Sequence, residues 1–340
     1  MKHVTIKDIA KELNLAVSTI SRAFNDKYDI RPETRKLVLE KAQQMGYRPN
    51  PIAKKLLQQK TLNIGIVIPE FIGSFFPEVI IGAQEVLFRE GYQTFITQSN
   101  ECSKNELQNV KLLYNSMVDG MLISLTHEAK NIDYYKELVA TGLPIVFFNR
   151  VNDDLNTSKV VFDDYKWSFF ATEHLIYQRF KKIFHLAGPA NLYLTENRKR
   201  GFTDALKKHR MSLTDNKIIT TDFMIEDGEK AAEELIQTND IPDAIFAAGD
   251  LTAIGAMKIF KKNGFRIPDD IAFMGFSEHT LARHVDPPLT SVAQPTFEIG
   301  RTAATLLIDQ IKNQGVFIPQ SITLSGKINL RSSSMRLKNA

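Results

Sequence analysis

Residues 4–25 read VTIKDIAKELNLAVSTISRAFN, a stretch with the pattern of two short helices. Thr5 and Asp8 have the spacing of an N-cap and the acidic residue that reaches back to it. Apolar side chains recur with the helical period at Ile6, Ile9, Ala10 and Leu13. Asn14 suits the left-handed conformation that ends a helix, and a second helix follows in which Ile20 and Phe24 point inward. We therefore predict a helix-turn-helix, although short helix pairs also occur in other helical domains.

The N-terminal segment is basic and the rest of the chain is slightly acidic. Residues 1–60 contain thirteen Lys and Arg against six Asp and Glu, whereas the formal net charge of all 340 residues is only +4. A basic segment suits a polyanion such as DNA. A solvated charged surface is the alternative interpretation.

A third helix and a connecting segment follow the helix pair. Arg31-Pro32-Glu33 predicts a helix start, since proline fits the first helical turn and Glu fits the positive end of the helix dipole. Residues 47–59 read YRPNPIAKKLLQQ and predict a short hinge helix that begins at Asn50-Pro51. So short a helix is marginal alone, and its basic and leucine side chains are typical of a segment that folds on DNA and inserts an apolar side chain into the minor groove. The alternative is a linker whose leucines pack on the next domain.

This N-terminal region resembles the LacI/GalR family of transcription regulators. The resemblance is carried by Val4-Thr5-Ile6-x-Asp8-Ile9-Ala10, Val17-Ser18-Thr19-Ile20-Ser21-Arg22, Thr34-Arg35 and Gly46-Tyr47-x-Pro49-Asn50, and by Pro287-Pro288-Leu289-Thr290-Ser291-Val292 near the other end. It covers nearly the whole chain.

From Thr61 onward, buried strands alternate with helices in two series, which predicts parallel sheets. The resemblance implies a small all-α headpiece (1–48), a hinge helix (49–60) and a two-lobed α/β core of the periplasmic-binding-protein type (61–340). It places the N-lobe at about 61–162 and 293–320, and the C-lobe at about 163–291 and 321–334. It also implies a homodimer on a pseudo-palindromic double-stranded operator.

No motif for catalysis, a cofactor or a metal is found. The chain lacks GxxxxGK[ST], GxGxxG, GxSxG and HExxH, and its seven histidines show no metal spacing. We therefore expect no enzyme activity, no cofactor and no metal. The single cysteine, the absence of a signal peptide and the absence of a long apolar run predict a cytoplasmic protein with no membrane partner.

The DNA-binding residues are carried over from the resemblance and interpreted chemically. Val17 and Ser18 open the recognition helix, where side chains reach base edges, and Arg22 suits a bidentate contact with guanine. Further expected contacts, mostly with phosphates or in the hinge, are Thr5, Thr19, Ser21, Asn25, Thr34, Tyr47, Asn50, Ala53 and Lys54. Leu56 is expected to enter the minor groove, so Leu56→Ala should weaken specific binding far more than non-specific binding. Ala16 replaces the usual Ser or Thr at the helix start, which removes a cap worth about 1 kcal/mol.

The resemblance also predicts an effector site between the lobes. Its expected residues are Phe75, Phe76, Asn149, Arg150, Arg198, Phe223, Asp250 and Ser277, with Asp163 near the same strand ends. The phenylalanines suit a core equally well, and Asp250 suits a helix cap. Ser277 and Glu278 stand where the family usually has two aspartates, and Gly249 stands where it commonly has asparagine. The two arginines favour a sugar acid or sugar phosphate over a neutral hexose.

The expected function is a repressor whose DNA affinity changes when a small sugar-like effector binds. An activator of the same fold and a cytosolic sugar sensor without DNA binding are the alternatives. The sequence does not distinguish an inducer from a co-repressor.

Overall fold

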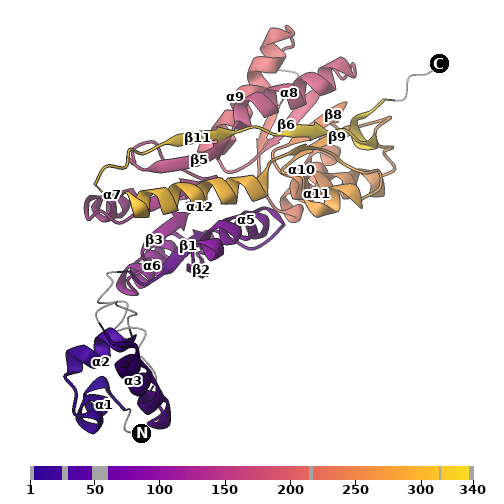
Figure 1. Cartoon of the computed structure of the whole chain (residues 1–340). Coiled ribbons are helices and arrows are strands. Elements are labelled where there is room, and N and C mark those ends of the chain that lie inside the picture. The colour runs from indigo at the N-terminus through magenta and orange to yellow at the C-terminus, as the bar shows by residue number, and fades with distance from the viewer. Residues whose placement is uncertain (1–3, 25–29, 48–59, 214–216, 314, 337–340) are drawn as a thin grey trace. The chain divides into compact units, whose positions relative to one another are not determined.

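The structure, a computed structural model, describes residues 4–24, 30–47, 60–213, 217–313 and 315–336. The chain divides into two compact units, Met1–Thr61 and Leu62–Ala340 (Figure 1). The predicted hinge at 49–60 lies outside the described residues except for Lys60. None of the described helices is long and apolar enough to cross a membrane.

The described residues of the first unit form a headpiece with the helices α1 (Ile6–Leu13), α2 (Val17–Phe24) and α3 (Pro32–Gln44). The predicted signals at both ends of α1 are confirmed. Asp8 accepts hydrogen bonds from the Thr5 amide (2.8 Å) and hydroxyl (2.7 Å). Asn14 is left-handed, with φ 51° and ψ 42°. Proline is the first residue of α3, as expected.

A small apolar core holds the three headpiece helices together. Its fully buried members are Ile9, Ala10, Ile20, Ala23, Val38 and Ala42. The ammonium of Lys41 on α3 lies 2.9 Å from Glu12 of α1. A core of this size stabilises a domain only marginally, so the caps at the helix ends matter for its stability.

The first lobe of the second unit contains a six-stranded sheet in the order β11-β5-β4-β3-β1-β2, with every pair parallel. Its strands are β1 (Asn63–Ile68), β2 (Gln93–Gln98), β3 (Gly120–Ile123), β4 (Ile145–Phe148), β5 (Ser158–Phe162) and β11 (Ser321–Leu324). Its helices are α5 (Phe75–Arg89), α6 (Ser103–Asn115), α7 (Ile132–Ala140) and α12 (Thr296–Lys312).

The second lobe repeats this arrangement with the order β12-β10-β9-β8-β6-β7. Its strands are β6 (Ile183–Ala187), β7 (Ile218–Thr220), β8 (Ala244–Ala247), β9 (Ala272–Phe276), β10 (Thr290–Ala293) and β12 (Lys327–Asn329). Its helices are α8 (Asp164–Tyr177), α9 (Tyr193–Lys208), α10 (Ile225–Gln237) and α11 (Asp250–Lys262), and short 3-10 turns lie at Thr280–Arg283 and Ser332–Ser334. Only β12 is antiparallel to its neighbour.

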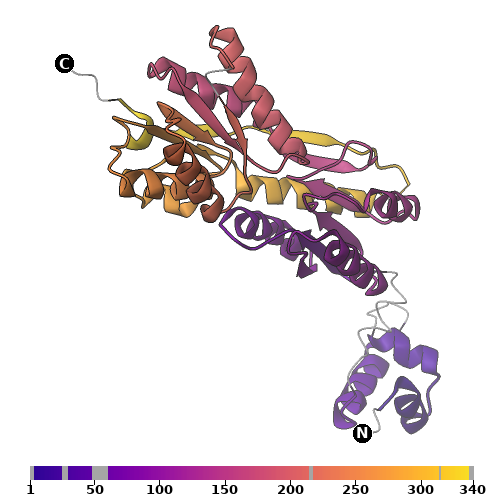
Figure 2. The ribbon, with the colours of Figure 1, turned by 180° about the vertical axis from the view of Figure 1, so that it is seen from behind.

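The chain passes between the lobes three times, at 163, 294–295 and 325–326. The prediction that 321–334 belongs to the C-lobe is wrong for Ser321–Leu324, because this strand pairs with β5 in the first sheet. The C-lobe also extends two residues further than the predicted 291, since β10 ends at Ala293. The yellow C-terminal segment follows this path from one sheet to the other (Figures 1 and 2).

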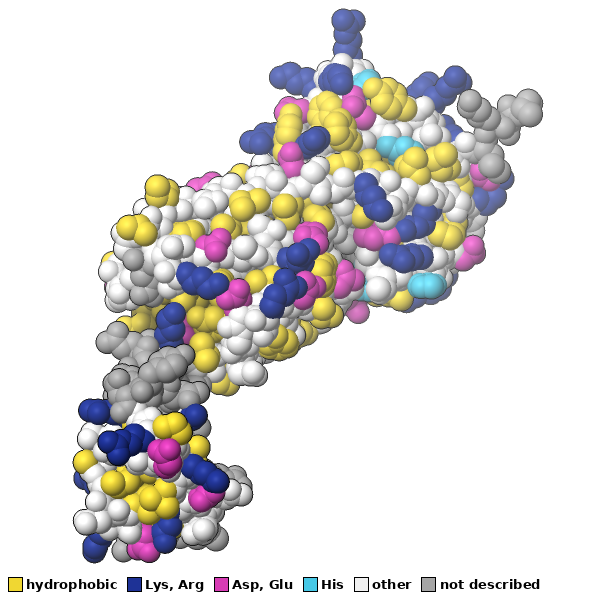
Figure 3. All heavy atoms as spheres, viewed as in Figure 1, with side chains coloured by type: hydrophobic (Ala, Val, Ile, Leu, Met, Phe, Trp, Pro, Cys, Tyr) yellow, Lys and Arg dark blue, Asp and Glu magenta, His cyan; other side chains and the backbone are white. Residues whose placement is uncertain are grey.

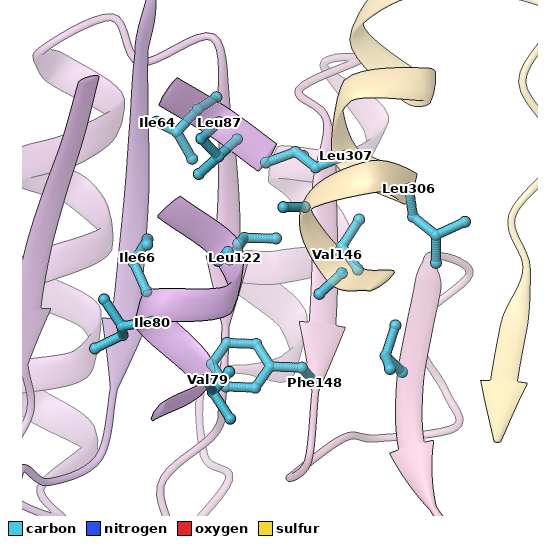
Figure 4. Close-up of a cluster of buried hydrophobic side chains, with 14 of the residues drawn as sticks. Ile64, Ile66, Val79, Ile80, Leu87, Leu122, Val146, Phe148, Leu306 and Leu307 are labelled. Carbon is cyan, nitrogen blue, oxygen red and sulfur yellow. The ribbon is translucent and has the colours of Figure 1, made fainter. Parts of the chain in front are cut away.

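Helices α5 and α12 lie side by side against one face of the first sheet. Figure 4 shows Val79 and Ile80 of α5 and Leu307 of α12 gathered with strand residues Ile66 and Val146. The backbones approach closely, because a Cβ at Gly300 would lie 1.8 Å from the carbonyl oxygen of Val79. This packing fixes the position of α5 relative to α12 and the first sheet.

Candidate functional site

The exposed face of α2 carries the side chains expected to read DNA. Ile20 and Ala23 face the headpiece core, at 0% and 1% exposure. Val17 is 39% exposed, and Ser18 and Arg22 are also exposed. The spacing of Ser18 and Arg22 by one helical turn places them on one stripe of the helix. Lys and Arg side chains stand out on the visible face of the headpiece (Figure 3).

The remaining predicted headpiece residues have mixed surroundings. The Thr5 hydroxyl donates to Asp8, and Thr19, Ser21 and Thr34 are half-buried. Tyr47 is also half-buried and its ring packs on Phe24, with centroids 5.2 Å apart, so its ring serves the headpiece core. The other predicted residues, Asn25, Asn50, Ala53, Lys54 and Leu56, lie outside the described part of the chain.

A cavity of about 470 Å³ lies between the two lobes of the second unit, where the carboxyl ends of strands from both sheets meet. All eight predicted effector residues line it, namely Phe75, Phe76, Asn149, Arg150, Arg198, Phe223, Asp250 and Ser277. Asp163 does not; it accepts a hydrogen bond from the Lys166 amide as the cap of α8. The residues placed by the resemblance therefore line one cavity, and their role in effector binding stays a prediction.

The family positions do not predict several other polar residues of the cavity. They are Glu70, Glu101, His127, Asp222, Glu226, Asp227, His279 and Gln294. Glu70 and Glu101 follow β1 and β2 within a few residues, so the strand-end rule would have found both. The described residues contain no group of His, Cys, Asp and Glu that could hold a metal ion.

Arg198 is held rigidly in the C-lobe wall. Its Nε donates to Oδ1 of Asp164 at 2.8 Å, and Nη1 donates to the Ala248 carbonyl at 2.6 Å. Nη2 lies 2.7 Å from the same Oδ1 in the ion pair. The guanidinium carbon lies 3.8 Å from the centre of the Phe276 ring. These contacts engage all three nitrogens of the guanidinium, so few of its five N–H groups remain for a ligand.

Arg150 occupies the N-lobe wall between two carboxylates. Its Nη1 lies 2.5 Å from Oε1 of Glu101. Burial raises the pKa of Glu70 to about 7, against the lowering effect of the nearby Arg150 charge. Oε2 of Glu70 is buried and has no hydrogen-bond partner among the described residues. An acceptor is thus left open on this wall.

Asp250 is the first residue of α11, not its cap, which is Gly249. Its oxygens accept from the Ser291 hydroxyl (2.7 Å) and the His279 amide (2.5 Å). Full burial raises the pKa of Asp250 to about 7. A Cβ at Gly275 would lie 2.0 Å from Oδ1 of Asp250, so only glycine allows this approach.

The ring of Phe223 lies directly on the backbone of the neighbouring strand ends. A Cβ at Gly188 would come within 2.2 Å of its Cζ, and one at Gly249 within 3.2 Å of its Cδ1. This explains the departure at position 249, because the asparagine expected there by resemblance would crowd the ring.

The loop after β9 is strained at the cavity edge. Ser277 and Glu278 have φ of 99° and 57°. Residues other than glycine rarely adopt such positive φ values. Glu278 points to Arg331 and Arg283, not into the cavity, and its amide donates to the Ser291 hydroxyl (3.1 Å). These contacts hold Ser277 at the cavity wall.

Two family profiles match the chain. Residues 5–50 match the family described as bacterial regulatory proteins, lacI family. Residues 61–325 match the periplasmic binding proteins and sugar binding domain of the LacI family.

Relatives and solved structures agree with these matches. The ribose operon repressor of Halalkalibacterium halodurans is 31% identical over 91% of both chains. The transcriptional repressor CytR of Escherichia coli is 31% identical over 92% of this chain and 91% of its own. A transcriptional regulator CelR–cellobiose complex has 27% identity, a TM-score of 0.74 and coverage of 97% and 100%. The lac repressor dimer bound to operator, at 22% identity, 98% and 100% coverage and a TM-score of 0.83, shows the same fold.

Proposed function

The chain belongs to the LacI family of bacterial regulatory proteins, and we propose that it acts in the cytoplasm as a homodimeric repressor on a pseudo-palindromic operator. It is a ligand-responsive, DNA-binding transcription regulator. Its relatives are transcription repressors and not enzymes.

The observation that carries the operator proposal is the stripe of Val17, Ser18 and Arg22 on α2. These side chains are exposed opposite the buried Ile20 and Ala23, as in a helix that enters the major groove. Val17 fits a thymine methyl group and Arg22 a guanine edge. Thr19, Ser21 and Thr34, together with Thr5, are proposed to position the headpiece on phosphates. Tyr47 and the hinge residues Asn50, Ala53, Lys54 and Leu56 complete the proposed interface, with Asn25.

The cavity is the proposed effector site. Its size suits a molecule of sugar dimensions, and its eight predicted residues combine aromatic walls with polar groups. Relatives are named for ribose, and one solved relative holds cellobiose. We therefore propose that a small polar molecule of this size occupies the cavity.

The edge of the first sheet is the proposed dimer surface. β2 is an edge strand, and large apolar side chains are exposed on it and on both flanking helices, as Ile81, Phe88, Phe95, Ile96 and Leu112. Exposed apolar groups of this extent usually mark an interface, and an uncovered edge strand invites pairing.

Effector binding would change DNA affinity through the relative position of the lobes. The cavity wall contains residues of both lobes, so a ligand binds one lobe arrangement more tightly than another. It shifts DNA affinity only by that difference.

The experiment is selection of the full chain on random DNA duplexes, followed by sequencing. We expect one pseudo-palindrome to be enriched. Arg22→Ala should lose about 1–3 kcal/mol of preference at one base pair in each half-site. Lys36→Ala removes a positive charge from α3, away from the stripe, and should keep the same site. Enrichment of one identical site by both variants would refute the assignment of Arg22, and no enrichment by the parent would refute operator recognition.

A further inference from the structure

The cavity contains more negative than positive charge. Six carboxyl groups line it, from Glu70, Glu101, Asp222, Glu226, Asp227 and Asp250, against the guanidinium groups of Arg150 and Arg198. Asp222 and Glu226 are exposed to the cavity side of the C-lobe, at the start of α10. An anionic ligand would therefore enter a negative field.

Both arginines are already neutralised within the protein. Arg198 contacts Asp164 through two nitrogens, and the pair has only 4% and 5% exposed side chains. Arg150, with a 7% exposed side chain, is paired with Glu101. Breaking a buried pair to free its cation is costly. The sequence-based preference for a sugar acid or sugar phosphate rested on these two charges and loses its support.

Two buried polar atoms in the cavity wall have no partner among the described residues. Oε2 of Glu70 is an acceptor on the N-lobe side. Nε2 of Gln294, a residue only 7% exposed, is a donor at the crossing between the lobes. Since buried polar groups normally have partners, a ligand with both a donor and an acceptor fits this pair.

Aromatic faces add a third element that suits positive charge. One face of Phe276 and one of Phe76 already bind the protein's own cations, the guanidinium groups of Arg198 (3.8 Å) and Arg150 (5.9 Å). Phe75 and Phe223 line the same cavity. Aromatic faces are a known binding surface for ammonium groups.

Resting on the proposed effector site, we propose that the effector of this chain carries a protonated amine, as an amino sugar or another small hydroxylated amine does. The ammonium group donates to Glu70 and to the carboxylates of the C-lobe wall. A hydroxyl of the same molecule accepts from Gln294. The excess of carboxylates disfavours sugar phosphates and sugar acids.

The ionisation of the cavity agrees with this ligand class. Burial raises the pKa values of Glu70 and Asp250 to about 7. Glu70 faces Arg150 and Glu101, and Asp250 faces Glu278, Arg331 and Arg198. An added cation would restore both carboxylates to the ionised form, so amine binding should release protons near neutral pH.

The test uses the full chain and needs no prior identification of the effector. A small-molecule extract of cells is separated by ion exchange into cationic, neutral and anionic fractions. Each fraction is assayed for a rise in the Tm of the core and for a change in operator binding. Glucosamine, glucose and glucose 6-phosphate serve as defined probes of the three classes. We expect the cationic fraction to act, and glucosamine to raise Tm more than the other two probes.

Matched variants assign the effect to the cavity. Glu70→Gln keeps the shape of the side chain and removes its charge. It should lower the affinity of the protein for the active component of the cationic fraction about tenfold. Glu233→Gln makes the same change on α10, at an exposed position outside the cavity, and should leave the response unchanged. Activity confined to the neutral or anionic fraction would overturn the amine assignment and leave the regulator intact. Inactivity of all three fractions would overturn ligand response itself, and the amine assignment with it.

Discussion

Arg198 on α9 and Asp164 on α8 form a buried ion pair, in which Nε donates to Oδ1 (2.8 Å) and Nη2 lies 2.7 Å from the same oxygen. The pair joins two packed helices directly behind the cavity wall. Both Arg198 and Phe276 line the cavity, and the Phe276 ring covers one face of the guanidinium at 3.8 Å. Arg198 therefore shapes the wall more than it supplies charge to a ligand.

Asp164→Ala should leave the Arg198 charge buried without its partner and lower the free energy of unfolding by about 3–5 kcal/mol. Denaturant unfolding of the full chain measures this loss. Glu196→Ala on α9 breaks the exposed ion pair with Lys199 and should cost less than about 1 kcal/mol. Equal losses in the two variants would show that water, not Asp164, balances the Arg198 charge.

Ala16→Ser should stabilise the start of the recognition helix. The carbonyl of Ala16 already accepts from the Thr19 and Ile20 amides, at 2.9 and 3.2 Å, but an alanine side chain accepts nothing. A serine oxygen would accept from a free amide of the first turn and gain about 1 kcal/mol. Hydrogen exchange of α2 amides and DNA titration measure the effect, and operator and random DNA should gain affinity together.

Ala16→Val is the control for this prediction, because valine caps no better than alanine. It should leave exchange in α2 unchanged. Slower exchange in both variants would attribute the gain to burial at position 16 and not to a cap.

Much of the fold was predictable because helix caps, helix ends and apolar runs depend on residues close together in the sequence. The cap at Thr5 and the left-handed Asn14 are set within one helix. Asn149, Asp250 and Ser277 come soon after buried strands with clear apolar runs, whereas Arg198 and Phe223 were placed by family resemblance alone. The edge strand β11 was assigned to the wrong lobe because its partner β5, about 160 residues away, decides its sheet. Helix α10 and the short β7 were not predicted, since Ile218–Thr220 is only half-buried and has no long apolar run.

The charge of the cavity was beyond local patterns for the same reason. Arg150 and Glu101 are 49 residues apart, and Arg198 and Asp164 are 34 apart. Sequence position identifies the arginines as cavity residues, but only the folded chain shows that each faces a carboxylate. The ligand class expected from sequence therefore differs from the one that the structure favours.

Phe88→Glu should separate the proposed dimer. Phe88 is 52% exposed on α5, and burying its replacement charge in an interface is unfavourable. Sedimentation should show monomers at concentrations where the parent is dimeric, with weaker operator binding. Val316→Glu alters a side chain that is 79% exposed and lies outside the β2 edge, and should leave both properties unchanged. A dimeric Phe88→Glu protein would place the interface elsewhere.

The last prediction concerns His185, which is fully buried in β6 between the rings of Phe202 and Phe246. Its Nδ1 lies 2.8 Å from the Phe246 carbonyl, so this nitrogen carries the proton of the neutral ring. Burial lowers the pKa of His185 to about 4 from 6.5.

Because the folded-state pKa of His185 is lower than its unfolded-state pKa, protonation favours unfolding. The stability due to neutral His185 is complete above pH 6.5 and is lost as the pH falls toward 4. Between pH 7 and pH 5 this loss is about 2 kcal/mol. We expect denaturant titrations to show that the free energy of unfolding of His185→Phe falls by about 2 kcal/mol less than that of the parent between pH 7 and pH 5. The exposed variant His284→Phe should lose as much stability as the parent. An unchanged pH dependence in His185→Phe would mean that the buried ring is not what makes the fold sensitive to acid.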